Sequence, residues 1–460
     1  MLAKKLNLLL LLSLSLSFFS CADDSENTGS ERNEEESEVP ETEGEQEEGE
    51  NETENNTNVL LIIADDMGPD ATPGYEIGSE KPNMPTLQSF IDNGIRFTNL
   101  WSAPTCTPTR STILTGKYGF KTNMLKVGDV LSPTETSLQS YIKNQTNDAY
   151  AQAIIGKWHL SSSATHPAEM GVEHYEGLLS GTPIAYDNWQ FTQNENTTTS
   201  NEYITTKYTD LVIDWLGNQT KPWFLWLAYT APHSPFHLPP LDLHDRDNLP
   251  SDQASVDANP LPYYFAMLEA MDTEMARLLN SLNEEALENT VIIFIGDNGT
   301  PRNTSQEYAA ARVKGSVYQG GVNVPMIVSG KNVTRVNEIE NALINTTDLF
   351  ATIANLTGVG ISQINDSSSF VNLLQGSAPV RDYAYAEIGY DSGGSDTAIR
   401  NETHKYILFE DGSEALYDLS ENPLENPNLL NANQLPISAE NEAQLNSLKE
   451  ELNNIKSASN

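Results

Sequence analysis

The chain has few cysteines and few basic residues, and each shortage excludes a class of protein. Only two of its 460 residues are cysteine, too few for a fold held by disulfides or for a zinc site of the Cys-x-x-Cys type. Its 25 Lys and Arg face 65 Asp and Glu, so the formal net charge is −40 and nucleic acid should be repelled. We therefore expect no nucleic-acid partner, and any site for an anion must be locally basic.

Long apolar runs are also scarce, and the longest lies at the start of the chain. Residues 6–19 are apolar and follow two lysines, but the run is too short to span a bilayer. It ends in Ser20-Cys21, which resembles a bacterial lipobox, so residues 1–21 are interpreted as a lipoprotein signal peptide with lipidation at Cys21. A plain secretory signal is the alternative. The prediction is an exported lipoprotein, anchored by lipid in the outer membrane and facing either the cell surface or the periplasm.

The next segment, residues 22–57, lacks the apolar side chains needed for a core. It carries 16 acidic residues and one basic residue, Arg32. Such a composition predicts an acidic, disordered tether. Asp23 and Asp24 resemble a surface-export signal of some lipoproteins, and a simple spacer is the alternative.

The pattern changes at residue 58, where short apolar runs begin to alternate with helical periodicity. Apolar runs without alternation predict strands buried on both faces, and they occupy residues 59–64, 153–155, 223–229, 291–295 and 324–328. Helical patterns cover residues 84–93, 203–216 and 263–282. This alternation predicts an α/β fold with helices on both faces of a sheet, and we assign residues 58–379 to a catalytic domain.

Residues 380–460 have a different sequence pattern, which predicts a small antiparallel subdomain. Residues 398–407 and 415–419 are expected as strands around the turn Glu410-Asp411-Gly412. A closing helix is expected at residues 439–455, with Ser438 as its N-cap.

Polar residues follow four of the predicted strands. They are Asp65 and Asp66, then Lys157 and His159, then His233, and last Asp297 and Asn298. Because ligands of open α/β sheets bind outside the carboxyl ends of the strands, these side chains should share one edge. Any one Asp would usually be a helix cap or a turn residue, but four matching strand ends favour a site.

The oxygen-bearing members of this set predict a metal centre. Asp65, Asp66, Asp297 and Asn298 offer hard oxygen ligands, which suit Ca²⁺ or Mg²⁺ better than zinc. Lys157 and His159 lie two positions apart on an expected extended stretch and could face one side together, as an anionic substrate would require.

The segment from Cys106 to Gly116 is the most informative in the chain. It contains Cys106-Thr107-Pro108-Thr109-Arg110 followed by Leu114-Thr115-Gly116, and it resembles the signature of the type I, formylglycine-dependent sulfatases. The segments 155–159 and 314–322 resemble further motifs of that family, and residues 405–423 resemble its closing segment. The likeness thus covers about residues 58–430. It implies an alkaline-phosphatase-like fold with a central mixed sheet flanked by helices and a small C-terminal antiparallel sheet.

The resemblance implies a role for each matching residue. Asp65, Asp66, Asp297, Asn298 and modified Cys106 would bind Ca²⁺; the catalytic set would be Cys106, Arg110, Lys157, His159, His233 and Lys314. A maturation enzyme would oxidise Cys106 to formylglycine, whose hydrated form attacks sulfur with Asp297 as the base while Arg110 holds it in place. Lys157 and Lys314 would neutralise the sulfate, His233 would protonate the leaving oxygen, and His159 would release sulfate by deprotonating the second hydroxyl.

The substrate is predicted only as a class. A lipid-anchored sulfatase suggests a sulfated polysaccharide, with an algal glycan such as ulvan as the first guess and host glycans as the second. His237 could contact the sugar, and Trp101, Trp189 and Tyr186 could stack on it or belong to the core. Two other functions stay open, a formylglycine-dependent phosphonate or phosphodiester hydrolase and an inactive surface glycan-binding lipoprotein.

Overall fold

The computed structural model describes residues 57–376 and 378–458. The predicted signal peptide with Cys21, and the predicted tether up to residue 56, lie outside these residues. Among the described helices, none has both the length and the apolar character needed to cross a bilayer.

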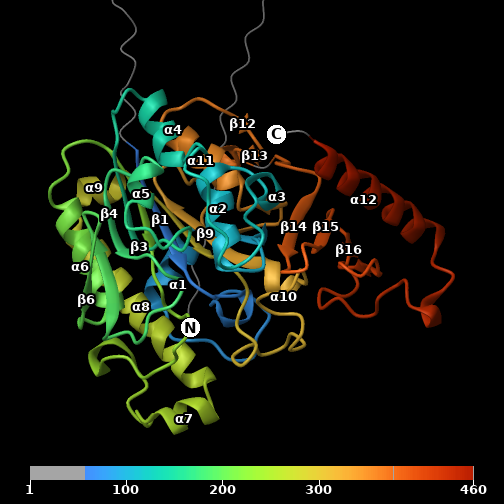
Figure 1. The fold of residues 1–460 in the computed structure, drawn as a ribbon, viewed down its shortest axis with the longest axis horizontal. Helices are drawn as coiled ribbons and strands as arrows, with labels where there is room; N and C mark the ends of the chain where they lie inside the picture. Colours follow the sequence, from blue (N-terminus) through green and yellow to red (C-terminus); the bar gives the residue numbers. More distant parts are fainter. Residues whose placement is uncertain (1–56, 377, 459–460) are drawn as a thin grey trace, which may run out of the picture. The chain divides into compact units, whose positions relative to one another are not determined.

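A mixed sheet of eleven strands organises the described chain, as the resemblance implies (Figure 1). Its order is β10 (Glu338–Glu340), β2 (Gly94–Trp101), β9 (Asn323–Gly330), β8 (Thr290–Gly296), β1 (Asn58–Ala64), β7 (Trp223–Ala228), β3 (Ala151–Lys157), β4 (Tyr175–Leu178), β5 (Trp189–Gln193) and β6 (Asn196–Ser200), with β11 (Ile344–Asn345) also on β2. The strands β8, β1, β7, β3 and β4 are parallel, whereas β9 is antiparallel to both of its neighbours.

The central strands are those predicted from continuous apolar runs. Every residue of β1, β7 and β8 is buried, which fits a sheet covered on both faces. The five predicted strands correspond to β1, β3, β7, β8 and β9. The edge strand β6 was not predicted, because its exposed Asn and Thr side chains carry no apolar signal, and β2, β4, β5, β10 and β11 were not predicted either.

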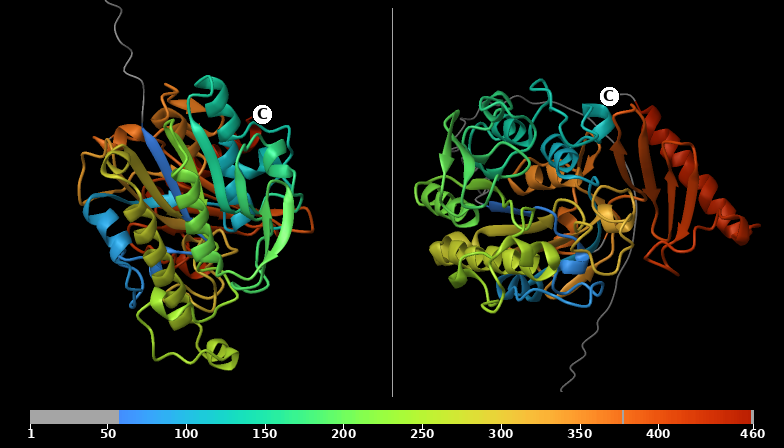
Figure 2. Two further views of the ribbon diagram at one scale, coloured as in Figure 1. Left: turned by 90° about the vertical axis from the view of Figure 1, so that its left-hand side faces the viewer. Right: turned by 60° about the horizontal axis from the view of Figure 1, so that its bottom comes forward.

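Two sets of helices cover the two faces of the sheet. Leu61 and Ile63 of β1 pack in a cluster with α2 (Cys106–Thr115), α4 (Leu138–Gln145) and α11 (Asp348–Leu356). Leu60 and Ile62 face the other way, toward α1 (Pro85–Asp92), α6 (Ile204–Leu216) and α8 (Leu261–Ser281). Figure 2 (right) shows yellow α8 and blue α1 on the opposite side of the sheet from cyan α2. The three predicted helices are confirmed as α1, α6 and α8, within two residues at each end.

A carboxylate from α8 caps the start of α1. The N-cap residue of α1, Met84, makes no side-chain cap bond. Instead, the buried Asp272 carboxylate accepts hydrogen bonds from the backbone N–H groups of Thr86 (2.9 Å) and Leu87 (2.8 Å). Helix starts leave such N–H groups unsatisfied, so Asp272 supplies from another helix what the local sequence lacks.

A separate antiparallel sheet follows, as predicted. Its strands β14 (Ala384–Gly389), β15 (Ser395–Arg400), β16 (His404–Leu408) and β17 (Glu414–Asp418) pair in chain order. Leu448 and Leu452 of α12 (Ala439–Ser457) pack against it, and Ser438 caps α12 by accepting from the N–H of Asn441 (3.1 Å). Figure 1 shows red α12 alongside these strands.

One strand prediction in this sheet was wrong. Residues 398–407 form two strands, because the chain turns between β15 and β16. The Asn401 side-chain oxygen accepts from the backbone N–H groups of Thr403 (3.1 Å) and His404 (2.8 Å), which closes the turn. The predicted turn at residues 410–412 does separate β16 from β17.

The remaining elements are short. They are α3 (Gly119–Thr122), α5 (His166–Glu169), α7 (Gln253–Ala258), α9 (Glu284–Glu288), α10 (Gln319–Val322), the two-stranded β12 (Gln363–Ile364) and β13 (Ser367–Ser368), and four 3-10 turns, Pro69–Ala71, Leu241–Leu243, Val371–Leu374 and Ala432–Gln434.

Replacing Asp272 tests the cap between α8 and α1. Asp272→Ala leaves the buried Leu87 N–H and the part-buried Thr86 N–H without acceptors, so we expect the free energy of unfolding to fall by about 2–4 kcal/mol. Asp272→Asn keeps one oxygen acceptor and should lose less, about 1–2 kcal/mol. Denaturant titration measures both, with the exposed Asn280→Ala on the same helix as a control that should change stability by less than about 0.5 kcal/mol. Equal stability of Asp272→Ala and wild type would contradict the role of the cap.

Candidate active site at the carboxyl ends of the strands

Four strand ends meet at one edge of the central sheet. In the parallel register, Ala64 of β1 lies beside Gly296 of β8, Ile63 lies beside Ala228 of β7, and Ala228 lies beside Gly156 of β3. The residues that follow are therefore neighbours in space: Asp65 and Asp66 after β1, Lys157 and His159 at the end of β3, His233 after β7, and Asp297 and Asn298 after β8. The structure thus brings together the segments that the sequence predicted to share one edge.

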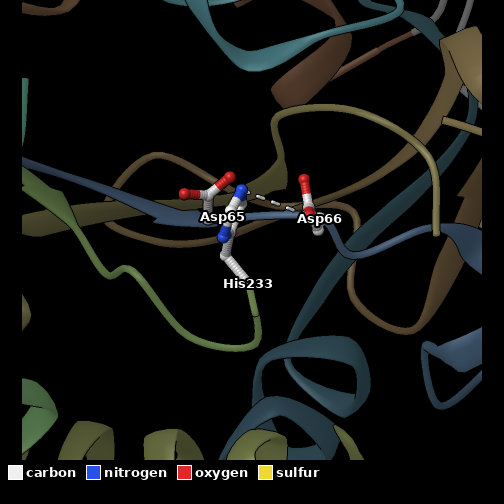
Figure 3. Close-up of side chains that lie close together, drawn as sticks. All are labelled: Asp65, Asp66 and His233. Carbon is white, nitrogen blue, oxygen red and sulfur yellow. Dashed lines mark ion pairs between the residues drawn. The ribbon is translucent and has the colours of Figure 1, made fainter. Parts of the chain in front are cut away.

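The acidic residues of this edge are buried and joined to one another. The Asp66 N–H donates to Asp297 Oδ1 (3.1 Å), and Asn298 Nδ2 donates to Asp66 Oδ1 (2.8 Å). Ligand atoms of Asp65, Cys106 and Asp297 lie within 4.8 Å of one another, as do those of Asp65, Asp66 and His233. Figure 3 shows the Asp65 and Asp66 carboxylates and the His233 ring close together.

Two oxygens in this cluster suggest that it can hold a metal ion. Asp65 Oδ1 and Asn298 Oδ1 are buried and make no hydrogen bond within the described chain. Buried polar atoms are costly to leave unsatisfied, and a cation would satisfy both. The remaining donors are carboxylates, so the set fits a hard divalent cation.

Cys106 lies at the first position of α2, against the acidic cluster. Its Sγ is 3.2 Å from His159 Nδ1 and 3.6 Å from Lys157 Nζ. The side chain is 1% exposed, and burial raises the pKa of the thiol to about 11. Cys106 is free, so as an unmodified residue it would be a neutral thiol and a weak nucleophile.

Arg110 stands one turn beyond Cys106 on α2 and ties the site together. Its Nη2 donates to Asp297 Oδ2 (2.8 Å), and its Nη1 donates to the backbone oxygen of Lys157 (2.7 Å). Arg110 therefore fixes two other site residues directly.

Lys157 and Lys314 each pair with one carboxylate of the cluster. Lys157 Nζ donates to Asp65, and Lys314 Nζ donates to Asp66. Burial raises the pKa of Asp65, whereas the Lys314 and His233 charges outweigh burial and hold the pKa of Asp66 well below its usual range. Burial and the neighbouring Asp65 raise the pKa of Asp297 to about 6.

His159 reaches the site through an unusual backbone conformation. The prediction that Lys157 and His159 face one side is confirmed by their contacts with Cys106, but the expected extended path is wrong. His159 has φ of 58°, a left-handed turn that swings its ring back toward α2. A Cβ on Gly181 would lie 2.3 Å from His159 Nε2, so a glycine leaves room for the ring.

His233 is held with one nitrogen directed toward the acidic pair. Its Nδ1 donates to the backbone oxygen of Ser234 (2.7 Å), and its Nε2 lies 3.8 Å from Asp66 Oδ2. Burial lowers the pKa of His233 to about 4, with Asp66 opposing the shift. Burial also lowers the pKa of His159 far below its usual value.

Two glycines of the motifs are required by the local backbone. Gly116 ends α2 in a left-handed conformation, with φ of 64°. Gly156 has φ of 113°, and a Cβ there would lie 2.0 Å from the Ala228 oxygen. The glycines thus end the helix that carries Cys106 and allow β3 to bring Lys157 next to β7.

The aromatic candidates for sugar stacking lie elsewhere. Trp101 and Trp189 are fully buried and belong to the core, and Tyr186, at 2% exposure, leaves too little of its ring free for a sugar to stack on it. His237 does not join the acidic cluster, because its Nε2 pairs with the Tyr203 hydroxyl (3.1 Å) and its Nδ1 with the Pro235 oxygen (3.0 Å).

Comparison with known proteins identifies the family. The sulfatase family model matches residues 57–359, which is more than half of the chain. The chain belongs to the sulfatase family. This agrees with the motifs around Cys106 and with the convergence of the strand ends.

Individual sulfatases and their structural neighbours are distant from this chain. An ulvan-active sulfatase from Formosa agariphila is 24% identical over 401 residues, covering 81% of this chain and 77% of that protein. The structure of Ps i-CgsB in complex with k-i-k-neocarrahexaose has a TM-score of 0.74 at 22% identity, covering 87% and 92% of the two chains. The phosphonate monoester hydrolase of Agrobacterium radiobacter has a TM-score of 0.64 at 20% identity, covering 87% and 95%. These structural likenesses show the fold alone.

Other sulfatase relatives are considerably longer than the matched region. The alignments span 57% of an Escherichia coli relative and 52% of a mouse relative.

A buried ion pair near Lys314 was missed from the sequence. Lys405 of β16 and Glu425 are both buried, and Lys405 Nζ donates to Glu425 Oε1 (2.6 Å). The other oxygen, Glu425 Oε2, accepts from the backbone N–H of Gln319 (2.8 Å), and Arg312 Nη1 donates to the Glu425 backbone oxygen (2.5 Å). Glu425 thereby connects the C-terminal sheet to both sides of the segment that carries Lys314.

The basic residues of this region also lie against aromatic rings, including that of Trp101. Lys405 Nζ lies 4.7 Å from the centre of the Trp101 ring, and the Arg312 guanidinium lies 4.6 Å from that of Tyr318. Lys405 and Tyr318 belong to segments that resemble family motifs and could be named from the sequence. Glu425 can be recognised as the partner of Lys405 only from the folded structure, in which the C-terminal sheet lies beside residues 312–319.

Breaking the Lys405–Glu425 pair tests this connection. Lys405→Met leaves the Glu425 carboxylate buried without its cation, so we expect a loss of about 3–5 kcal/mol in the free energy of unfolding. The double variant Lys405→Met/Glu425→Gln has no unpaired charge and should lose less. Tryptic cleavage after Arg312 and Lys314 should accelerate in the single variant.

A matched control is available on the surface. Lys449→Met breaks the half-exposed pair with Glu414 and should cost less than about 1 kcal/mol. If Lys405→Met were as mild as Lys449→Met, the buried pair would have no special role.

Proposed function

We propose that this chain hydrolyses sulfate esters and that Cys106, oxidised to formylglycine by a maturation enzyme, is the nucleophilic residue. One observation carries the proposal: the Cys106 side chain lies between a buried acidic cluster and two groups, Lys157 and His159, that suit an anionic substrate. Hydrated formylglycine supplies two hydroxyl groups on one carbon, one to attack and one to drive release.

The charges of the site support an anionic substrate. The buried carboxylates of Asp65, Asp66 and Asp297 are matched by the cations Arg110, Lys157 and Lys314. A Ca²⁺ ion, which the four oxygen ligands and residue 106 would hold, adds two positive charges and supplies Lewis acidity. The site would then attract sulfate although the protein carries a net charge of −40.

The chain's own residues can perform the remaining proton and charge transfers. Lys157 and Lys314, which pair with Asp65 and Asp66, would neutralise the sulfate oxygens. Asp297, held by Arg110, is the base proposed for the attacking hydroxyl. His159, 3.2 Å from the residue 106 side chain, is neutral and can accept the proton of the second hydroxyl.

His233 is the proposed acid for the leaving oxygen. In the free site its pKa of about 4 makes it neutral at pH 7. A bound sulfate adds negative charge beside the ring and so favours the protonated form, in which Nε2 can donate. The Nδ1 bond to Ser234 keeps Nε2 directed toward the site.

The proposed substrate is a sulfated polysaccharide or its oligosaccharides. The ulvan-active relative supports an algal glycan, and ulvan remains the first guess. We further propose the cell envelope as the location, with a lipid anchor at Cys21 and no nucleic-acid partner.

Part of this evidence also fits two other functions. A phosphonate or phosphodiester hydrolase could use the same fold, since one structural neighbour is a phosphonate monoester hydrolase. An inactive glycan-binding protein would not need every candidate metal and catalytic position, yet all of them are present, and all except the half-buried His159 and Lys314 are buried. Sulfate hydrolysis therefore has the stronger support.

Oxidation of Cys106 is the first requirement to test. The protein co-expressed with a formylglycine-generating enzyme should release sulfate from an aryl sulfate and from some sulfated algal oligosaccharides. Cys106→Ala should lower kcat by at least about 10⁴-fold, because no covalent nucleophile remains. Peptide mass verifies the modification. Modified protein that cleaves phosphonates or phosphodiesters but no sulfate ester would overturn the proposal.

Metal binding is tested separately by thermal unfolding. If Ca²⁺ binds the folded site, saturating Ca²⁺ at about 100 times Kd should stabilise the protein by about 2.7 kcal/mol and raise its Tm. EGTA should remove both this shift and the activity. Asp65→Asn keeps the side-chain shape but removes a ligand charge, so its Ca²⁺-dependent shift should be smaller. The metal centre would be refuted if Ca²⁺ did not change the Tm of the wild type and the protein kept full activity in EGTA.

A further inference from the structure

A cavity of about 780 Å³ lies beside the loop that carries His233. Its size is within the range of ligand pockets and can accommodate a sugar unit. Residues 235–238 form one wall, residues 184–187 with Tyr203 form a second, and the loop leading into α7 (Gln253–Ala258) forms a third. None of these residues belongs to the metal and catalytic set.

Direct contacts link this cavity to the candidate active site. Tyr186, which lines the cavity, donates its hydroxyl hydrogen to the backbone oxygen of His233 (2.7 Å). The ring of Phe236, another lining residue, lies 6.0 Å from that of Tyr264, whose hydroxyl donates to the Asp66 backbone oxygen (2.8 Å). The cavity and the proposed acid for the leaving group therefore share one loop and its supports.

The cavity offers the kind of surface that binds sugars. The half-buried rings of Tyr203 and His237 lie 5.6 Å apart at an edge-to-face angle of 68°, and their polar atoms meet at 3.1 Å. Asn201, Ser251 and Gln253 add hydrogen-bonding groups, while Ile184 and Leu241 add exposed apolar surface. Aromatic faces with a few polar groups match the mixed apolar and hydroxyl surface of a pyranose ring.

The charges of the lining disfavour a second anionic group. No Lys or Arg is among the lining residues, whereas Asp187 and Asp247 are. Burial lowers the pKa of His237 below its usual value, which favours the neutral ring. A sulfate or uronic carboxylate in this cavity would meet negative charge without a cationic partner, in contrast to the three cations of the active site.

We propose that this cavity binds the sugar unit next to the sulfated one and selects an uncharged unit there. The inference rests on the proposed sulfatase function and specifies its substrate: the sulfated sugar is flanked, on the leaving-group side of His233, by a sugar with neither sulfate nor carboxylate.

The charge selection is tested with matched disaccharides. Both carry the same sulfated sugar, for example sulfated rhamnose, linked either to xylose or to glucuronic acid. Wild-type enzyme should favour the xylose compound by at least about tenfold in kcat/KM, because only the uronate meets Asp187 and Asp247. The double variant Asp187→Asn/Asp247→Asn should reduce this preference at least about threefold. The proposal is overturned if the uronate compound is cleaved equally well or better.

Cavity filling tests the location. Asn201→Trp places an indole in the cavity and should lower the ratio of disaccharide to aryl sulfate kcat/KM by about tenfold. Asn218→Trp, at an exposed position outside the cavity lining, is the matched control and should leave the ratio unchanged. An unchanged ratio in Asn201→Trp would place the flanking sugar elsewhere.

Binding to a catalytically silent protein separates this inference from the function itself. Cys106→Ala should bind the xylose disaccharide more tightly than the uronate in saturation-transfer NMR, and Asn201→Trp in that background should abolish the difference. If wild type cleaves no sulfate ester, the proposed function fails. If it cleaves aryl sulfate while neither binding nor cleavage distinguishes the disaccharides, only the cavity proposal fails.

Discussion

The site depends on burying charges that are unstable alone. Asp65, Asp66 and Asp297 are almost completely excluded from water, and an isolated buried carboxylate would cost several kcal/mol. Each is compensated by a cation from a different part of the chain: Lys157 on β3, Lys314 after β8 and Arg110 on α2. The fold must therefore bring these segments into register before the charges can be buried.

Because Lys314 must be held in position, the small C-terminal sheet contributes to the active site. Lys314 lies on an irregular segment, where side chains are less constrained than on a strand. Glu425 holds both sides of that segment, and it is itself neutralised by Lys405 from β16. The buried Lys405–Glu425 pair thus positions the segment of Lys314, which in turn pairs with Asp66. Both sheets therefore contribute to the arrangement of charges in the site.

The distribution of charge also separates the active site from its surroundings. The protein is acidic overall, yet the cluster around Cys106 has as many cations as carboxylates, and a divalent ion would make it positive. No Lys or Arg lines the neighbouring cavity. An anionic group and an uncharged ring can consequently be bound side by side, each in an environment of suitable polarity.

The central strands, the main helices and most of the residues of the candidate site could be predicted from the sequence. Unbroken apolar runs such as residues 59–64 are a local signal, and the polar pairs that follow them must meet when the strands are parallel. The motif around Cys106 added the family. These inferences succeeded because each rests on neighbouring residues or on the regular geometry of a sheet.

Several features could not be predicted from the sequence, because they depend on how the chain folds. The left-handed turn at His159, the cap that Asp272 provides for α1, and the pair of Lys405 with Glu425 leave no local pattern. Burial of Trp101 and Trp189 likewise depends on what covers them. Long-range packing and buried charge pairing are properties of the folded chain, so sequence reasoning could name their members but not their partners.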